Sequence, residues 1–287
     1  MLATLSICLE LLNTQTLRGV ALKTLDQQTT TLESNFIKDQ TTNVVVFGTY
    51  PGDFNMIEYA QKISYYNDKL RQKNVDQITL VANGTPQAAQ LLAKLVDLPK
   101  NVQLLADENG QAANAFGVNR GWLPDTDSIQ LRDDFNLPIS PYAKLFGMLW
   151  GLGALYTLPS VISGYLGNPQ GTNGWIEKAL AQGQRAGRWP NTALELGPDG
   201  EVSRNKFDDL PLVGNWGRRP LELATLRLQN MIGLSISNWD ELAPTDERCL
   251  TMLGGLLCVR DGETLFEWRD DGICHTADFE ALLQLLD

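Results

Sequence analysis

The sequence has little histidine and little positive charge. Its single histidine, His275, excludes a multi-histidine metal cluster and an acid–base mechanism that needs two imidazoles. Lysine and arginine number 23 against 34 aspartate and glutamate residues, which gives a formal net charge of −11. Because such a chain repels phosphate backbones, we do not expect nucleic-acid binding as its main role.

Cysteine is also scarce. Cys8, Cys249, Cys258 and Cys274 form no Cys-x-x-Cys pair, and a chain of 287 residues that is 43% apolar can build a core without disulfides. This usage predicts a reducing, cytoplasm-like compartment. The sequence also lacks a glycine-rich phosphate loop followed by a basic helix, so we expect no cofactor and no metal.

No segment has the full set of features of an export signal or a membrane span. Residues 1–12 are apolar but lack a basic start and a small-residue cleavage site, so we expect a helix packed on the body. Residues 145–176 contain no charged residue. The apolar part, 145–166, has the length of a span of about 20 residues. Because Pro159 and several glycines interrupt it, a buried segment or a docking surface explains it at least as well.

The first part of the chain alternates between strand and helix patterns. The β-branched run at 43–48 predicts a central strand that is buried on both faces. Residues 77–82 and 102–106 predict two more strands. Apolar spacing predicts helices after the first strand, over 86–96 and just before Gly117. This order implies right-handed crossovers and parallel strand pairing.

Regular patterns return near the C-terminus. The runs at 253–259 and 264–268 flank Asp261-Gly262, which is a strong signal for an antiparallel hairpin. A last helix is predicted after a cap at Thr276 or Asp278.

The middle of the chain interrupts this pattern. Residues 120–248 are dense in proline, glycine and tryptophan, with one clear amphipathic helix predicted at 219–236. We therefore expect one α/β unit formed by residues 1–119 and 249–287, with 120–248 as a large irregular or helical insertion before the C-terminal hairpin.

Three stretches carry a family resemblance. VVVFGTYPGDFNMIEYAQKI (44–63), DENGQAANAFGV (107–118) and LGGLLCVRDGETLFEWRDDGICHTADFEALL (253–283) resemble the peroxiredoxin-like (AhpC/TSA-type) family related to prostamide/prostaglandin F synthase. The first looks like that family's active-site strand, loop and helix. The resemblance implies a thioredoxin-like mixed sheet of about five strands, flanked by helices.

The catalytic cysteines of that family are missing here. The family places Gly-Cys-x-x-Cys at the start of the first helix, where the helix dipole lowers the thiol pKa. Residues 52–56 of this chain read Gly-Asp-Phe-Asn-Met, so Asp53 and Met56 occupy the two cysteine positions. Neither a carboxylate nor a thioether can exchange a disulfide. The degenerate active-site positions are Thr49, Pro51, Gly52, Asp53 and Met56.

Two interpretations remain open for this loop. Asp53 or Asn55 is predicted as the N-cap of the helix, and Asp53 is alternatively interpreted as a general base or a ligand carboxylate. Thr49, Tyr50 and Pro51 line the same loop and could form a small binding cleft at the carboxyl ends of the strands. Tyr50 and Phe54 would fill that cleft if their side chains turned into it. Met56 is interpreted as a core residue.

The rival hypothesis is a thiol-dependent peroxidase or oxidoreductase that uses a non-standard cysteine. Cys274 precedes His275, and an imidazole beside a thiol can activate it, although neighbours in a loop usually point apart. Cys258 is predicted in a strand core, while Cys8 and Cys249 are interpreted as small apolar fillers. A distant pairing among the four stays open.

The insertion predicts a docking surface. Trp122, Trp150, Trp175, Trp189 and Trp216 fall in it, and tryptophan and arginine dominate the energetics of buried interfaces. The predicted partner or membrane contacts are Leu145, Phe146, Leu149, Trp150, Leu152, Leu155 and Tyr156. Arg218 and Arg219 either contact an acidic partner or merely precede the helix at 219–236.

The sequence therefore favours a redox-inactive protein that acts as a binding, assembly or accessory subunit of a protein complex. Both a membrane-embedded complex and one outside the membrane are open as the partner. Family members with such long insertions look like proteins of oxygenic phototrophs. That resemblance implies a location on the cytoplasmic or stromal side, peripheral to a thylakoid membrane. A small-molecule binding module built on residues 49–56 is the third hypothesis.

Overall fold

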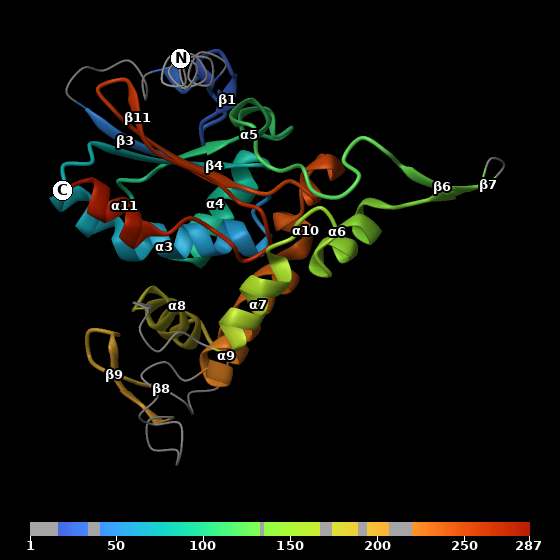
Figure 1. The fold of residues 1–287 in the computed structure, drawn as a ribbon. Coiled ribbons are helices and arrows are strands. Elements are labelled where there is room, and N and C mark those ends of the chain that lie inside the picture. Colours follow the sequence, from blue (N-terminus) through green and yellow to red (C-terminus); the bar gives the residue numbers. More distant parts are fainter. Residues whose placement is uncertain (1–16, 34–40, 133–134, 167–173, 189–193, 207–219) are drawn as a thin grey trace.

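The centre of the molecule is a mixed sheet of seven strands in the order β11-β10-β3-β4-β5-β1-β2 (Figure 1). The computed structural model describes residues 17–33, 41–132, 135–166, 174–188, 194–206 and 220–287. The expectations for residues 1–12 and for Cys8, Trp189, Trp216, Arg218 and Arg219 lie outside these ranges.

The strands predicted from the sequence are confirmed. β3 (Thr42–Phe47), β4 (Gln77–Ala82) and β5 (Gln103–Ala106) pair in parallel, as their order implied. The hairpin around Asp261-Gly262 consists of β10 (Gly255–Arg260) and β11 (Glu263–Arg269), and β10 pairs antiparallel with β3.

The sheet has more strands than the expected number of about five. The two additional strands are β1 (Leu22–Lys23) and β2 (Thr29–Thr30), which form a short hairpin. Lys23 pairs with Ala106, so this hairpin extends the sheet beyond β5.

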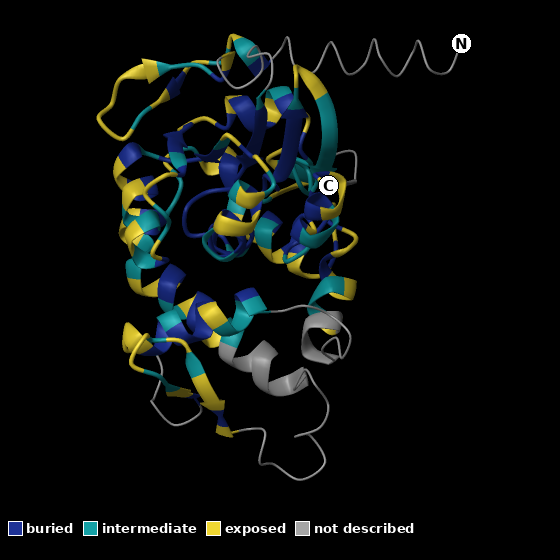
Figure 2. Cartoon of the chain, turned by 90° about the vertical axis from the view of Figure 1, so that its left-hand side faces the viewer, coloured by how far each residue is buried: buried dark blue, intermediate teal, exposed yellow. Residues whose placement is uncertain are grey.

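Helices cover both faces of the sheet. The alternating side chains of β3 explain why: Val44 and Val46 face one side, and Val45 and Phe47 face the other. The first side packs against α3 (Phe54–Gln72), α4 (Pro86–Leu95) and α11 (Phe279–Leu285). The second packs against α5 (Gln111–Phe116), where Phe47 and Phe116 stack with ring centroids 4.4 Å apart. The most buried residues gather in these central strands (Figure 2).

Polar side chains cap the starts of α3, α4 and α11. Asp53 caps α3, and Thr85 caps α4, whose first residue is Pro86. Of the two candidates for the last helix, Asp278 is the cap of α11. Thr276 donates its hydroxyl to Glu58 instead.

The segment 120–248 contains helices and two small hairpins. The predicted helix at 219–236 is confirmed as α9 (Pro220–Ser235). The other helices are α6 (Pro141–Leu149), α7 (Thr157–Leu166), α8 (Gly174–Arg185), η2 (Ile236–Asn238), α10 (Trp239–Leu242) and η3 (Glu247–Leu250). The hairpins, which the sequence analysis did not predict, are β6 (Ser128–Arg132) with β7 (Phe135–Pro138), and β8 (Leu194–Leu196) with β9 (Val202–Asn205). The β6–β7 hairpin projects away from the body (Figure 1).

The long apolar run is divided between two helices. α6 ends at Leu149, and Gly151 and Gly153 turn the chain with positive φ values of 90° and 66° before α7 begins at Thr157. Among the described residues, no helix combines the length and the hydropathy that crossing a bilayer requires.

Gly48 is required where β3 meets α3. A Cβ at this position would collide with the sulfur of Met56 and would lie 2.9 Å from the Val81 carbonyl oxygen. Gly48→Ala should lower the free energy of unfolding by about 1–3 kcal/mol, measured by urea denaturation. The matched control is Gly19→Ala, because a Cβ at Gly19 has no neighbour within 4 Å. Equal stability of the two variants would contradict the close approach.

Candidate functional site

The loop between β3 and α3 holds Asp53 in a closed network. The Thr49 hydroxyl donates to Asp53 Oδ2 at 2.6 Å, and the Asn55 backbone N–H donates to the same oxygen at 3.0 Å. Asp53 is only 9% exposed, and burial raises its carboxyl pKa to about 6 although these hydrogen bonds oppose the rise. The N-cap interpretation is therefore confirmed, and the carboxyl group is directed inward.

Residues 235–242 cover this loop. Ser235 Oγ donates to the Gly52 carbonyl at 2.6 Å, and the Gly52 N–H donates to the Leu242 carbonyl at 3.1 Å. The Trp239 ring meets the Tyr50 ring edge-on at 5.9 Å. The cleft that the sequence analysis considered at Thr49, Tyr50 and Pro51 is therefore filled, because these residues are buried beneath the end of α9 and α10.

Met56 lies in the core, as its residue type predicted. It is fully buried among the side chains between α3 and the sheet. Met56 therefore serves as an apolar packing residue.

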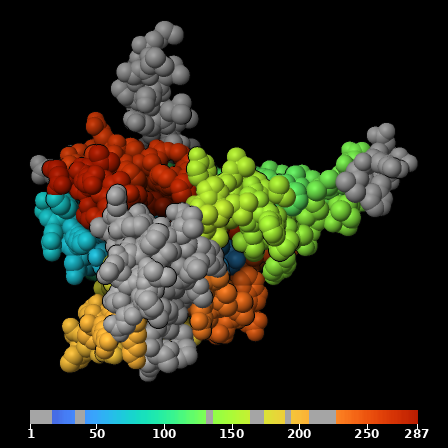
Figure 3. Space-filling model, turned by 60° about the horizontal axis from the view of Figure 1, so that its bottom comes forward, coloured from blue at the N-terminus to red at the C-terminus, as the bar shows by residue number. Residues whose placement is uncertain are grey.

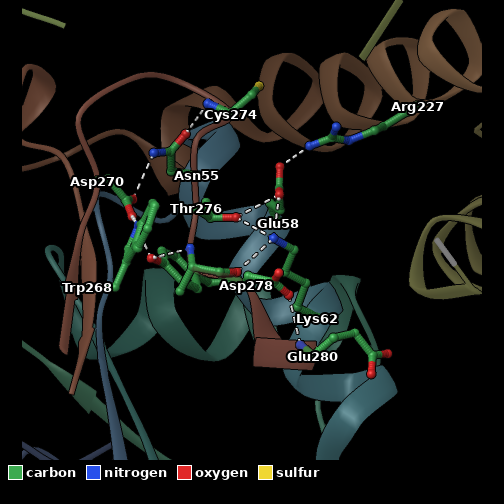
Figure 4. Close-up of polar contacts among 12 residues, drawn as sticks. Asn55, Glu58, Lys62, Arg227, Trp268, Asp270, Cys274, Thr276, Asp278 and Glu280 are labelled. Carbon is green, nitrogen blue, oxygen red and sulfur yellow. Dashed lines mark hydrogen bonds and ion pairs between the residues drawn. The ribbon is translucent and has the colours of Figure 1, made fainter. Parts of the chain in front are cut away.

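A buried polar cluster lies directly behind the loop (Figure 4). Asp270 is fully buried and accepts hydrogen bonds from Asn55 Nδ2 at 2.9 Å, Tyr59 OH at 2.6 Å and Trp268 Nε1 at 3.1 Å. Burial raises the pKa of Asp270 to about 7, against the effect of these donors and of Lys62.

The same cluster contains a buried ion pair on α3. Lys62 Nζ lies 2.9 Å from Glu58 Oε1 and donates to Thr276 Oγ1 at 2.6 Å, while Thr276 donates to Glu58 Oε1 at 2.7 Å. Arg227 of α9 also pairs with Glu58. Burial lowers the pKa of Lys62 to about 8. The cluster joins α3, α9 and the C-terminal segment.

The sequence analysis missed this cluster. Its signal was polar residues at helical spacing, Asn55, Glu58, Tyr59 and Lys62, which share one face of α3. Their partners lie more than 150 residues away, so sequence spacing could not pair them.

The described cysteines are free thiols with raised pKa values. Burial raises the pKa of Cys249 and Cys258 to about 12, and it raises that of Cys274 despite the nearby Arg227 guanidinium. A protonated thiol is a weak nucleophile. His275 pairs with Asp271, and its ring stacks on Tyr156 with centroids 5.0 Å apart.

An exposed apolar surface covers α6, the turn after it and the start of α7. Its large side chains are Tyr142, Phe146, Leu149, Trp150, Leu152, Leu155, Tyr156, Leu158 and Ile162, with Leu155 the most exposed at 79%. The only charged residue between 141 and 162 is Lys144, which is 5% exposed and pairs with Asp127 at 3.2 Å. We call these nine residues the apolar surface.

Six of the seven residues predicted for docking belong to this surface. Leu145 does not, because it is partly buried and packs with Met148, Ala154, Leu253 and Ile273. Leu145 therefore helps to anchor α6 to the body, and its prediction as a contact residue stays a prediction.

The underside of the apolar surface is fixed to the body. The Tyr156 N–H donates to the Asp271 carbonyl at 3.3 Å, and the Ile273 N–H donates to Thr157 Oγ1 at 3.0 Å. Tyr142 also lies 6.4 Å from the Trp239 ring that covers the loop. Figure 3 shows this segment on the outside of the molecule, beside the C-terminal segment.

Asp53 generates a test of capping and of pH dependence. Asp53→Ala should lower the free energy of unfolding by roughly 0.5–2 kcal/mol because the cap is lost, whereas Asn retains an acceptor and should cost less.

The buried Asp53 carboxyl should also make stability depend on pH. Its pKa in the folded protein is raised to about 6, so the protonated carboxyl stabilises the fold below the pKa that Asp53 has in the unfolded chain. This stabilisation is lost as pH rises from there toward 6. The stability of wild type relative to Asp53→Asn should therefore fall across that range in urea titrations. A pH-independent difference would contradict the buried carboxyl.

Comparison with known proteins adds no relative. No protein-family model, no curated protein and no solved structure matches this chain.

Proposed function

We propose that this chain is a redox-inactive thioredoxin-like protein that acts as a binding, assembly or accessory subunit of a protein complex, through the apolar surface. The observation that carries the proposal is that surface: nine large apolar side chains stand exposed without one exposed charge between residues 141 and 162.

The strand order supports the thioredoxin-like part of the proposal. The order β11-β10-β3-β4, with a parallel β3–β4 pair and antiparallel β10, is the arrangement that the resemblance implies. α3 and α11 share one face of the sheet, while α5 covers the other. Asp53 then stands at the start of the helix where the attacking cysteine of the peroxiredoxin-like family would be.

The site geometry supports the absence of redox chemistry. The loop offers a buried carboxyl and a buried thioether, and residues 235–242 lie over it. Cys249, Cys258 and Cys274 have raised pKa values, so few of these thiols are ionised at neutral pH.

The composition of the apolar surface favours a protein partner over direct lipid contact. Large aromatic side chains such as Trp150, Tyr142 and Tyr156 are enriched at protein interfaces, and burial of one such group contributes about 1.5–3 kcal/mol. Peripheral membrane helices instead combine an apolar face with lysine and arginine, which attract anionic lipids. The apolar surface carries no exposed lysine or arginine among residues 141–162, and the chain has a net charge of −11.

The proposed location follows from the resemblance. The partner is proposed to be a membrane-embedded complex, with this protein peripheral to a thylakoid membrane on the cytoplasmic or stromal side. The partner should therefore be recovered from native membranes that are extracted with mild detergent.

Charges introduced into the apolar surface should release the partner. Leu149→Asp and Leu152→Asp replace side chains that are 44% and 45% exposed, so the fold should persist while binding weakens roughly tenfold or more. Leu285→Asp, at a similarly exposed position (49%) on α11, is the matched control. The measurement is co-purification of tagged protein from membranes in mild detergent. Partner retention equal to that of the control in both variants would remove this surface from the interface.

The purified protein should not turn over hydroperoxide through its own thiols. We expect wild type and a variant with all four cysteines replaced by alanine to consume hydroperoxide at the same background rate. A coupled assay with excess thiol reductant measures this. Turnover that disappears when Cys274 alone is replaced would contradict the redox-inactive assignment.

A further inference from the structure

A cavity of about 300 Å³ lies between α3 and α8. Gln61, Asn67 and Asp68 of α3 line it together with Lys178 and Arg185 of α8, and Asp97 belongs to the segment that closes it. Figure 1 shows α8 lying next to α3, on the side away from the sheet. The cavity shares no residue with the covered loop or with the apolar surface.

Two buried amides at this cavity have unused hydrogen-bonding atoms. Gln61 is 5% exposed, and neither its Nε2 nor its Oε1 has a partner among the residues that the structure describes. Asn67 is 6% exposed; its Nδ2 donates to Asp68 Oδ1 at 2.9 Å, but its Oδ1 accepts from no group in the described part of the chain. Buried polar groups are almost always paired, because leaving one unpaired is costly. Two such residues in one cavity wall indicate a group supplied from outside the chain.

The charges around the cavity carry both signs in equal number. Asp68 and Asp97 provide two carboxylates, and Lys178 and Arg185 provide two cations. Within the described ranges, Lys178 Nζ makes one long hydrogen bond, of 3.4 Å, to the Ser64 carbonyl. A purely anionic or purely cationic ligand would lie near two charges of its own sign at this site. A zwitterion can instead place its negative group near the two cations and its positive group near the two carboxylates.

We infer that this cavity binds a small zwitterion of the free amino-acid class, with an amide side chain. The ligand carboxylate pairs with Lys178 and Arg185, and its ammonium group pairs with Asp68 and Asp97. An amide both donates and accepts, so it can satisfy both polar atoms of Gln61. Because α8 belongs to the segment 120–248 and α3 to the sheet domain, bound ligand would strengthen the contact between them.

The first experiment uses L-glutamine as the probe, with full-length protein and isothermal titration calorimetry. The two matched probes are glutaramate, which lacks the ammonium group, and 4-aminobutanamide, which lacks the carboxylate. L-glutamine should bind in the millimolar range or tighter, and each truncated probe should bind at least about tenfold more weakly. Equal binding of all three probes would overturn the assignment to a zwitterion.

The second experiment separates a ligand site from a packing defect. Gln61→Leu removes both unpaired atoms at similar size, so the free protein should melt at the same temperature or higher while L-glutamine binding is lost. Lys178→Met should weaken binding, with Lys100→Met as a control on an exposed residue outside the cavity.

Two results would overturn the inference. The first has two parts: Gln61→Leu is more stable than wild type, and neither L-glutamine nor any other standard amino acid shifts the melting temperature of wild type. Water alone would then occupy the cavity. The other is undiminished L-glutamine binding by Gln61→Leu. Neither result bears on partner docking, which is measured on separate residues.

Discussion

The buried ionic and hydrogen-bonded contacts of α3 hold the rest of the structure in place. Glu58 binds Lys62 on the same helix and Arg227 on α9, while Asn55 and Tyr59 bind Asp270 of the C-terminal segment. Removal of one partner from such a cluster leaves a charge buried without compensation, which is far costlier than the loss of a surface pair. The contacts therefore fix where α9 and the C-terminal segment lie on the sheet domain.

Two features of the molecule depend on that placement. α9 ends at Ser235, so its position brings Ser235, Trp239 and Leu242 over the loop that contains Asp53. The C-terminal segment continues from Asp270 to Ile273, which holds the beginning of α7 through Thr157. The same cluster thus fixes the segments that cover the Asp53 loop and support the surface proposed to dock a partner.

Local sequence patterns predicted the helices, strands and turns better than they predicted which side chains contact one another. The β-branched run at 43–48, the Asp-Gly turn at residue 261 and the cap at Asp53 are governed by neighbours in sequence, and each was predicted correctly. The uncharged run at 145–166 left a buried segment and an exposed surface equally open, and only the structure shows that most of its large side chains are exposed. The partial burial of Leu145 was not predicted because its partners, Leu253 and Ile273, are distant in sequence. The polar cluster and the cavity at Gln61 were missed for the same reason.

The sequence by itself determined the alternation of strands and helices, the acidic charge and the absence of a thiol at residues 53 and 56, since these follow from residue type and local spacing. Only the tertiary structure decided that the loop is covered, that Glu58 meets Arg227 and that Gln61 and Asn67 bring amide atoms without a partner among the described residues to one cavity. The reason is physical: pairing, burial and the resulting pKa shifts arise between groups that the chain brings together from more than a hundred residues apart, and no local pattern encodes which groups will meet.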